Sequence, residues 1–197
     1  MFRTALVLAA LVLFGTPARA QEVVQAPSDT VRQVRRALDR LPYYGVFDFV
    51  AFGVKDRVVT LQGFVQRAAL RKEAEQMVRK ATGLEVANQI EVLPASSIDD
   101  GLRWEAYLRI YSDEFATQYV SGGSATVRFD AVEMSRFPGM EPYGNYPVHI
   151  IVRNRTILLV GVVDSDFDKQ ALLARARLVP HVIKLEDGVS IRSRNTQ

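Results

Sequence analysis

The sequence contains no cysteine among its 197 residues. This absence excludes disulfide bonds, thiol catalysis, thiolate metal ligands and a lipid-modified N-terminal cysteine. Histidine is scarce as well, since His149 and His181 are the only two, and neither stands beside a cluster of acidic residues at a metal-ligand spacing. The sequence therefore predicts no metal and no cofactor, and a stable fold must rest on apolar cores.

Catalytic motifs are also missing. The chain has no G-x-S-x-G motif, no phosphate-binding glycine motif and no GxxG loop of the kind that binds nucleic acid. The acidic run Asp164–Asp168 begins like a calcium loop, but Lys169 and Arg175 stand where an EF-hand needs glycine and glutamate. Acidic residues of this kind suit the start of a helix. We predict a protein that is not an enzyme.

Only one long apolar run occurs, from Ala5 to Phe14. Arg3 precedes it, and Ala18-Arg19-Ala20 follows as an A-x-A cleavage pattern, which together are typical of a secretory signal peptide over residues 1–20. A membrane anchor is the alternative, but the run is shorter than the ~20 residues that span a bilayer. We expect cleavage after Ala20, export of the mature protein and a flexible leader over residues 21–27.

An excess of charge of one sign is lacking too. The chain has 25 basic and 22 acidic residues. Loss of residues 1–20 removes Arg3 and Arg19 and no acid, which leaves 23 basic residues against 22 acidic ones. A nearly neutral protein has no general attraction to nucleic acid, and we expect no such partner. Any affinity for anionic lipid must come from a local patch.

One segment occurs twice. Residues 54–65 read VKDRVVTLQGFV, and residues 152–163, 98 positions later, read VRNRTILLVGVV. Two apolar runs around a short charged turn predict a β-hairpin, and its recurrence predicts two copies of one module. Gly63 and Gly161 fall at the same place, where glycine marks a bulge or the close approach of another backbone. We expect that backbone to be a helix that crosses the sheet.

Helix and strand periodicities around each hairpin complete the modules. In the first module the second helix ends at Gly83, and the third strand alternates around Asn88. The predicted fold class is α+β, with two tandem α-β-β-α-β modules, each a three-stranded sheet covered by two helices. The predicted boundaries are 28–93 for the first module, 94–101 for a polar linker, 102–191 for the second module with an insertion over 121–146, and 192–197 for a tail.

Two apolar patterns in this scheme bear on packing. The helix over residues 166–179 carries an apolar stripe of Phe167, Ala171, Ala174 and Leu178, which predicts its buried face. Both sheets are apolar on their outer faces as well, whereas a sheet facing water should alternate apolar and polar residues. We expect the outer faces to cover each other, and an interface with a partner or a second copy is the alternative. The outer-face residues are Phe47, Phe49, Val58 and Phe64 in the first module and Ile151, Leu158, Val160 and Val162 in the second.

The repeated hairpin, the helix that follows it and the strand around Asn88 together resemble the BON domain family. The resemblance rests on Val54, Val58, Val59, Leu61, Gly63 and Val65, the alanine-rich helix that follows, and the strand G83-L84-x-V86-x-N88-x-I90-x-V92, with a second copy from Pro147 to Val182. In the second copy His181 stands where glycine is usual, and Asp187 where asparagine is usual. The resemblance implies a three-stranded sheet covered on one side by two helices, a periplasmic location linked to envelope and osmotic stress, and a binding role for which phospholipid membranes have been proposed.

Two groups of aromatic residues with neighbouring arginines are the candidate lipid-binding or partner-binding residues, because such groups suit a membrane interface. For both groups, packing against the second module is the alternative. We expect a phospholipid surface to be the ligand. A soluble scaffold or stress chaperone that binds a protein or an envelope polymer is the other hypothesis. The first group is Arg136, Phe137, Met140, Tyr143 and Tyr146 in the insertion, and the second is Arg103, Trp104 and Tyr107 on the helix that opens the second module.

Overall fold

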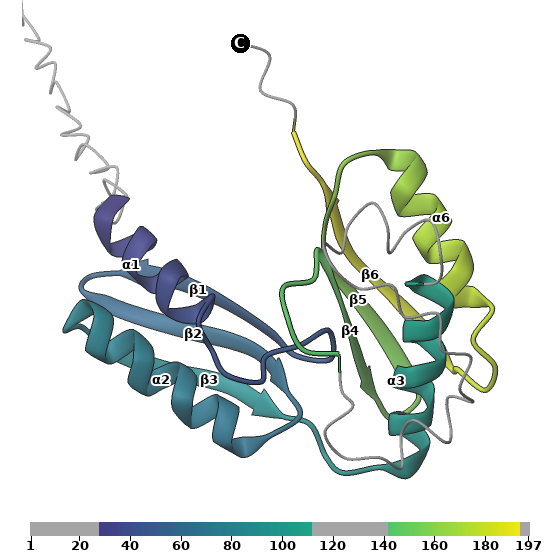
Figure 1. The fold of residues 1–197 in the computed structure, drawn as a ribbon, viewed down its shortest axis with the longest axis horizontal. Helices are drawn as coiled ribbons and strands as arrows, with labels where there is room; N and C mark the ends of the chain where they lie inside the picture. The colour runs from purple at the N-terminus through teal and green to yellow at the C-terminus, as the bar shows by residue number, and fades with distance from the viewer. Residues whose placement is uncertain (1–27, 112–141, 194–197) are drawn as a thin grey trace, which may run out of the picture.

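The structure is a computed structural model that describes residues 28–111 and 142–193. It contains two modules of the same kind, which confirms the predicted α+β class (Figure 1). In the first module the elements are α1 (Ser28–Leu38), β1 (Phe49–Lys55), β2 (Val58–Val65), α2 (Ala68–Thr82) and β3 (Glu85–Val92). In the second they are α3 (Ser97–Ile110), β4 (Val148–Arg153), β5 (Thr156–Val163), α6 (Asp166–Arg177) and β6 (Lys184–Ile191).

Each module holds one three-stranded mixed sheet. The orders are β1-β2-β3 and β4-β5-β6, with the first pair antiparallel and the second pair parallel in both. The hairpins turn at Asp56-Arg57 and Asn154-Arg155, and all four residues have φ between 49° and 64°. Positive φ at both central residues is the geometry of a two-residue turn that matches the twist of its strands. The repeated segment is therefore a repeated hairpin.

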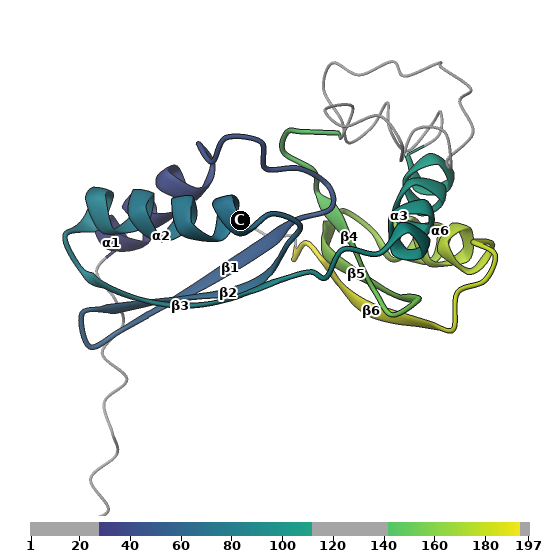
Figure 2. The ribbon, with the colours of Figure 1, turned by 90° about the horizontal axis from the view of Figure 1, so that it is seen from below.

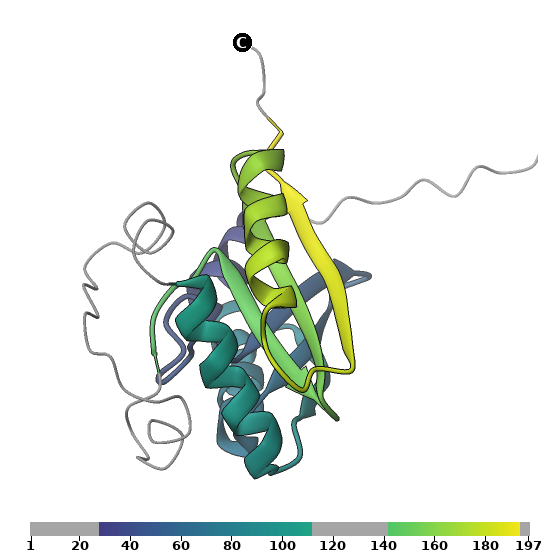
Figure 3. The same cartoon turned by 90° about the vertical axis from the view of Figure 1, so that its right-hand side faces the viewer.

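Two apolar cores lie between the sheets and their helices. The first core joins Val34 of α1 and Leu70 of α2 to Leu61 of β2, and the second joins Ile110 of α3 and Leu172 of α6 to the β4–β5 hairpin. Figure 3 shows α3 and α6 side by side across the second sheet. Each core packs one sheet face against two helices, as the repeat predicted.

The helix α6 buries a different face from the one predicted. Phe167 is 80% exposed and Leu178 is 66% exposed, whereas Leu172, Leu173 and Ala176 are buried. This helix carries two apolar stripes, so spacing alone cannot identify the one that packs. The helix buries the stripe that contains two adjacent leucines, because these side chains fill more of the volume between α3 and the second sheet. Phe167 and Leu178 remain on the surface.

The helix α3 begins inside the stretch predicted to be a linker. Its N-cap is Ser96, whose hydroxyl accepts a hydrogen bond from the amide of Asp99 at 3.2 Å. A serine cap followed by acidic residues is a helix start that carries no apolar period. Because the prediction followed apolar spacing, it placed the start of the helix too late.

The repeated glycines do not mark a helix crossing. A side chain at Gly63 would overlap the carbonyl of Phe49, and one at Gly161 would overlap the carbonyl of Pro147. Both atoms belong to the partner strand of the hairpin or its extension, and φ is 131° and 154° at the two glycines. The close backbone is therefore the antiparallel neighbour in the same sheet, and the expectation of a crossing helix was wrong.

The connection between α1 and β1 joins the two modules. Val46 and Phe47 belong to the second module's core, although they lie in the first module's sequence. The Ile150 amide of β4 donates to the Val46 carbonyl at 2.8 Å, and Gly45 forms a β-bridge with Tyr143. The connection thus lies along the free edge of β4 and completes the second core.

The outer faces of the two sheets cover each other only in part. Among the described residues they meet at a corner, where the Arg153 guanidinium lies 5.6 Å from the centre of the Phe64 ring and pairs with Glu91 at 2.7 Å. Val162 on the outer face is 39% exposed. Figure 2 shows the sheets next to each other, with α1 and α2 over the first and α3 and α6 over the second. Phe64 of the first sheet lines one cavity with Ile151 and Leu158 of the second, and Ile151 is buried, so the predicted contact forms at this corner but does not extend to Val162.

Candidate functional site

A cavity lies where the two modules meet, and it is the candidate site. Its volume is ≈ 260 Å³. Four parts of the chain surround it: the connection from α1 to β1, the residues after β2, the short link from β3 to α3, and the first two turns of α3. We call it the junction cavity. It is lined by Phe47, Gln66, Arg67, Leu93, Pro94, Ala95, Asp100, Arg103 and Trp104.

Arg103 is the buried cation of this cavity, with 2% of its surface exposed. Its guanidinium forms an ion pair with Asp100 and donates a hydrogen bond to the Val152 carbonyl at 2.8 Å. Its Nε is buried and has no hydrogen-bond partner among the described residues. Burial lowers the pKa of Arg103, while Asp100 and Asp99 act against that shift. A buried unpaired donor costs free energy, so the Arg103 Nε weakens rather than strengthens the junction.

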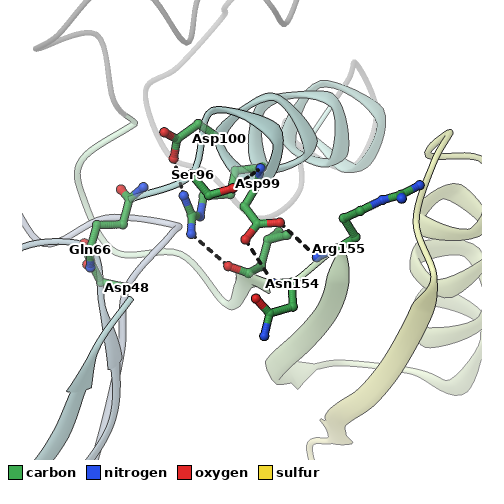
Figure 4. A network of polar contacts seen from close by, with 9 residues as sticks. Asp48, Gln66, Ser96, Asp99, Asp100, Asn154 and Arg155 are labelled. Carbon is green, nitrogen blue, oxygen red and sulfur yellow. Dashed lines mark hydrogen bonds and ion pairs between the residues drawn. The ribbon is translucent and has the colours of Figure 1, made fainter. Parts of the chain in front are cut away.

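Asp48 is the buried carboxylate beside the junction. It accepts hydrogen bonds from the amides of Gln66 at 2.8 Å and Gly45 at 3.3 Å. Burial raises its pKa, although these two amides, Arg67 and Arg103 oppose the shift. Asp48 therefore ties the end of β2 to the connection that enters the second module, and Figure 4 shows Asp48 and Gln66 together on the first module.

Asp99 is a second aspartate that links two parts of the chain, here α3 and the hairpin turn of the second module. Its two carboxylate oxygens accept the amides of Asn154 and Arg155, each at 2.9 Å. Figure 4 shows Asp99 pointing from α3 to this hairpin turn. Because a carboxylate satisfies two adjacent turn amides, it fixes the hairpin against the helix that bears Arg103.

An exposed aromatic cluster borders the cavity. The Arg67 guanidinium lies 5.3 Å from the ring centre of Tyr43 and 5.2 Å from that of Tyr143, and it donates to the Tyr43 carbonyl and, at 3.3 Å, to the Tyr143 hydroxyl. Tyr43 is 64% exposed and Tyr143 is 37% exposed. We call these three residues the tyrosine–arginine cluster. It presents a cation held between two aromatic rings to the surface.

The sequence-predicted binding residues separate in the structure. Arg103 and Trp104 are buried in the junction cavity, so neither can lie on a membrane while the protein is folded. Tyr107 and Tyr146 are half-buried, with ring centres 6.2 Å apart, in the aromatic part of the second core. Tyr143 is on the surface, in the tyrosine–arginine cluster. Arg136, Phe137 and Met140 lie outside the described residues.

Tyr43, Arg67, Asp48 and Phe47 are site residues that the sequence analysis missed. Tyr43 lies in a turn, Arg67 is the N-cap of α2, and Phe47 and Asp48 lie just before β1. Nothing in the sequence spacing of these residues shows that they meet. Arg67 precedes α2, and Tyr43 has a left-handed φ of 58°. Positive φ at a non-glycine residue is uncommon, and only a structure reveals it.

Gly83 and Asn88, which were predicted to be structural residues, both contact α2. Gly83 ends α2 with φ 66°, and its amide donates to the Arg79 carbonyl at 2.9 Å. Asn88 on β3 donates to the Arg71 carbonyl of α2 at 2.9 Å and accepts from the Ile90 amide at 3.2 Å. Gly83 therefore caps α2, and Asn88 holds α2 on the first sheet. In the second module Asp187 pairs with Lys169 of α6 at 2.9 Å.

Residues 28–111 and 142–193 contain neither a metal-ligand cluster nor a membrane-spanning helix. No group of three or more histidine or acidic side chains is arranged there to hold a metal ion. None of the helices in these ranges is long and apolar enough to cross a bilayer.

Comparison with known proteins identifies one part of the chain. The sequence model of the BON domain matches residues 28–94. No curated protein matches the chain. Two solved structures show a likeness at 10% identity: CdsD, a structural protein of the type III secretion system of Chlamydia trachomatis, with 85% of this chain and 94% of that one covered and a TM-score of 0.27, and the C-terminal domain of CdsD, with 85% and 100% covered and a TM-score of 0.26. TM-scores this low do not establish a shared fold.

Proposed function

Residues 28–94 are a BON domain, followed by a second module of the same architecture, and from this premise we propose that the chain is a periplasmic binding protein of the cell envelope that associates with phospholipid surfaces. BON domains are non-catalytic binding domains that are generally linked to the membrane, the envelope and osmotic stress. The proposal includes export by the N-terminal segment and a role in envelope or osmotic stress.

One observation carries the proposal: the exposed tyrosine–arginine cluster. Tyrosine is enriched at membrane–water interfaces because its ring is apolar and its hydroxyl is polar. Arg67 supplies a cation between two such rings, and among the described residues it forms no ion pair with a carboxylate. A cation near the surface attracts phosphate headgroups by about 1 kcal/mol. The cluster therefore supports contact with a lipid surface.

Vesicle flotation tests this proposal. The mature protein is mixed with phospholipid vesicles at low salt, and the fraction that floats is compared between the wild type and the double variant Tyr43→Ser/Tyr143→Ser. We expect the double variant to lose most of its binding. Phe167→Ser is the matched control, because it also removes an exposed aromatic ring but from α6. Absence of flotation by the wild-type protein would refute the lipid proposal.

A second function is favoured by the exposed face of α6. Phe167 projects from the start of this helix, Leu178 is exposed at its C-cap, and Ile183 in the loop after it is 71% exposed. An apolar helix stripe of this kind suits the groove of a protein partner. If the chain is instead a soluble scaffold or stress chaperone, Phe167→Ser abolishes partner capture, and vesicles bind neither the wild type nor the tyrosine variants.

A further inference from the structure

Another cavity lies in the first module, between the last turn of α1 and the first half of β1. Its volume is ≈ 230 Å³. Its rim is formed by Arg35, Asp39 and Asn145, which are all exposed, so the cavity opens to the surface. We call it the α1 cavity. The rest of its wall consists of Leu38, Leu41, Tyr44, Val50 and Phe52.

The α1 cavity has the size and the chemistry to hold one aromatic ring. An apolar cavity of about 150 Å³ lined by leucine, isoleucine and phenylalanine holds one benzene molecule. The α1 cavity is larger and has side chains of the same kind in its wall. The Val50 amide on this side of β1 already donates to the Tyr44 hydroxyl at 3.2 Å, so it needs no partner from a ligand. A ring placed against this wall leaves water and gains the free energy of apolar burial.

The second module presents such a ring on its surface. Phe167 at the start of α6 is 80% exposed, more than any other large apolar side chain among the described residues. It therefore does not fill the α1 cavity of its own chain, and Figure 1 shows α1 and α6 on different modules. An exposed apolar side chain that fits a cavity elsewhere on the same molecule produces a head-to-tail contact between copies.

The charges beside the ring and beside the cavity are opposite in sign. Phe167 stands between Asp166 and Asp168, whereas residues 35–40 read RRALDR, with three arginines and one aspartate. Asp166 and Arg35 are exposed, and neither forms an ion pair among the described residues. Opposite charges on two surfaces speed their encounter and fix how they dock. The start of α6 is thus complementary to the rim of the α1 cavity in both shape and charge.

We propose that the α1 cavity receives Phe167 of a second copy of this chain, so that copies associate head to tail. The ring and the cavity lie on different surfaces, so a dimer keeps one unused ring and one unused cavity and can bind further copies. A contact anchored on one aromatic side chain is small, and the association is therefore weak and depends on concentration. The inference does not rest on the lipid function, because no residue of the tyrosine–arginine cluster lines the α1 cavity.

Sedimentation equilibrium tests the association. The average mass of the mature protein is measured from micromolar to hundreds of micromolar concentration at low salt. We expect the mass to rise with concentration, and Phe167→Ser to weaken the association by about tenfold or more. Ile183→Ser is the matched control, because it removes another exposed apolar side chain of the same module, beyond the other end of α6.

Two results of this measurement would overturn the proposal. If the wild type keeps the mass of a monomer over the whole series, no second copy binds, and the exposed face of α6 is left to a different protein. If Ile183→Ser weakens the association as much as Phe167→Ser, the contact is not made by the ring that fits the cavity.

Variants of the cavity test the other side of the contact. Leu38→Gln removes apolar wall, and Arg35→Glu reverses a charge at the rim. Each should weaken the association by about tenfold or more. Lys80→Glu is the matched control for Arg35→Glu, because it makes the same change of charge at an exposed residue of α2 outside the cavity. Equal weakening by these two charge variants would show a general effect of charge and would exclude the α1 cavity as the acceptor.

A mixture of two variants tests the head-to-tail geometry. Phe167→Ser keeps the cavity without the ring, and Leu38→Gln keeps the ring without an intact cavity. Each alone should stay monomeric where the wild type associates, and the mixture should form a dimer with one copy of each and no larger species. Arg35→Glu replaces Leu38→Gln if a thermal melt shows that Leu38→Gln is unfolded. Two folded variants that form no mixed dimer would contradict the proposed contact.

Discussion

The two modules share a scaffold but differ in how complete they are. The first closes its core with its own residues, from Val34 on α1 to Ile90 on β3. The second takes Val46 and Phe47 from the first module's sequence, and it has an aspartate, Asp99, that holds its hairpin turn. The repeat therefore conserves the hairpin and its glycine, while the residues that differ are those that join the modules. The candidate site lies at that joint.

The largest expected effect comes from Phe47, because it is 2% exposed and fills the second core beside Trp104, with ring centres 5.3 Å apart. Phe47→Ala should lower the free energy of unfolding by about 3–5 kcal/mol. Denaturant unfolding followed by Trp104 fluorescence measures it, with the exposed Phe167→Ala as the control. A loss below about 1 kcal/mol would show that the second module does not need the connection.

The second effect concerns acid stability and the buried His149 of β4, which contacts the same connection through the Gly45 carbonyl at 3.1 Å. Burial lowers the pKa of His149 to about 4, although hydrogen bonding to the backbone opposes the shift. Between pH 6.5 and about 4 the unfolded chain binds this proton and the folded chain does not. The free energy of unfolding should therefore fall as the pH falls through this window, by about 3 kcal/mol.

The variant His149→Gln isolates this contribution. It removes the titrating group, so the fall in the free energy of unfolding between pH 6.5 and 4 should shrink by about the same amount. Asp48, whose pKa is raised by burial, acts in the opposite direction and is present in both chains. Denaturant unfolding at several pH values gives the comparison, and identical pH profiles for the two chains would contradict the assignment to His149.

The third effect compares the two hairpin turns. Asp99→Asn replaces one of the two accepting oxygens with a donor, so an amide of the Asn154-Arg155 turn loses its partner. The free energy of unfolding should fall by about 2 kcal/mol. In the first module, Asp56→Asn changes an exposed residue of the corresponding turn and should have an effect within about 0.5 kcal/mol. Equal effects at the two positions would remove this difference between the modules.

The smallest effect concerns the left-handed residue after the second helix of each module. Gly83 has φ 66°, and His181 at the corresponding place has φ 64°. Gly83→Ala should destabilise the protein by about 1 kcal/mol, and His181→Gly should stabilise it by a similar amount, because only glycine adopts this conformation freely. Thermal melting of the two variants checks the opposite signs.

Sequence patterns predicted the parts of the fold that depend on neighbours along the chain. The hairpins, the capped helix α2 and the strand around Asn88 follow from local spacing and turn chemistry. The contacts of the site depend on segments far apart in the sequence. Phe47 was predicted to lie on the outer face of the first sheet, and only the packing shows that β1 starts at Phe49 while Val46 and Phe47 enter the other module.

The exposed face of α6 illustrates the same limit. Leu172, Leu173 and Ala176 form one apolar stripe, and the predicted stripe from Phe167 to Leu178 forms another. The free energy gained by burial depends on the volume that α3 and the second sheet leave open, which is a tertiary property. The charged residues of the candidate site are a second example. Arg67 and Arg103 are 36 positions apart, and no sequence motif shows that they line one cavity.

We infer that the connection from Tyr43 to Asp48 makes the two modules unfold as one cooperative unit, because its residues Val46 and Phe47 complete the second core. The most direct test follows unfolding in denaturant by two signals at once: the fluorescence of Trp104, which reports the second module, and amide exchange of β2, which reports the first. The structure predicts coincident transitions in the wild type and separated transitions in Phe47→Ala. Separate transitions in the wild-type protein would contradict the claim.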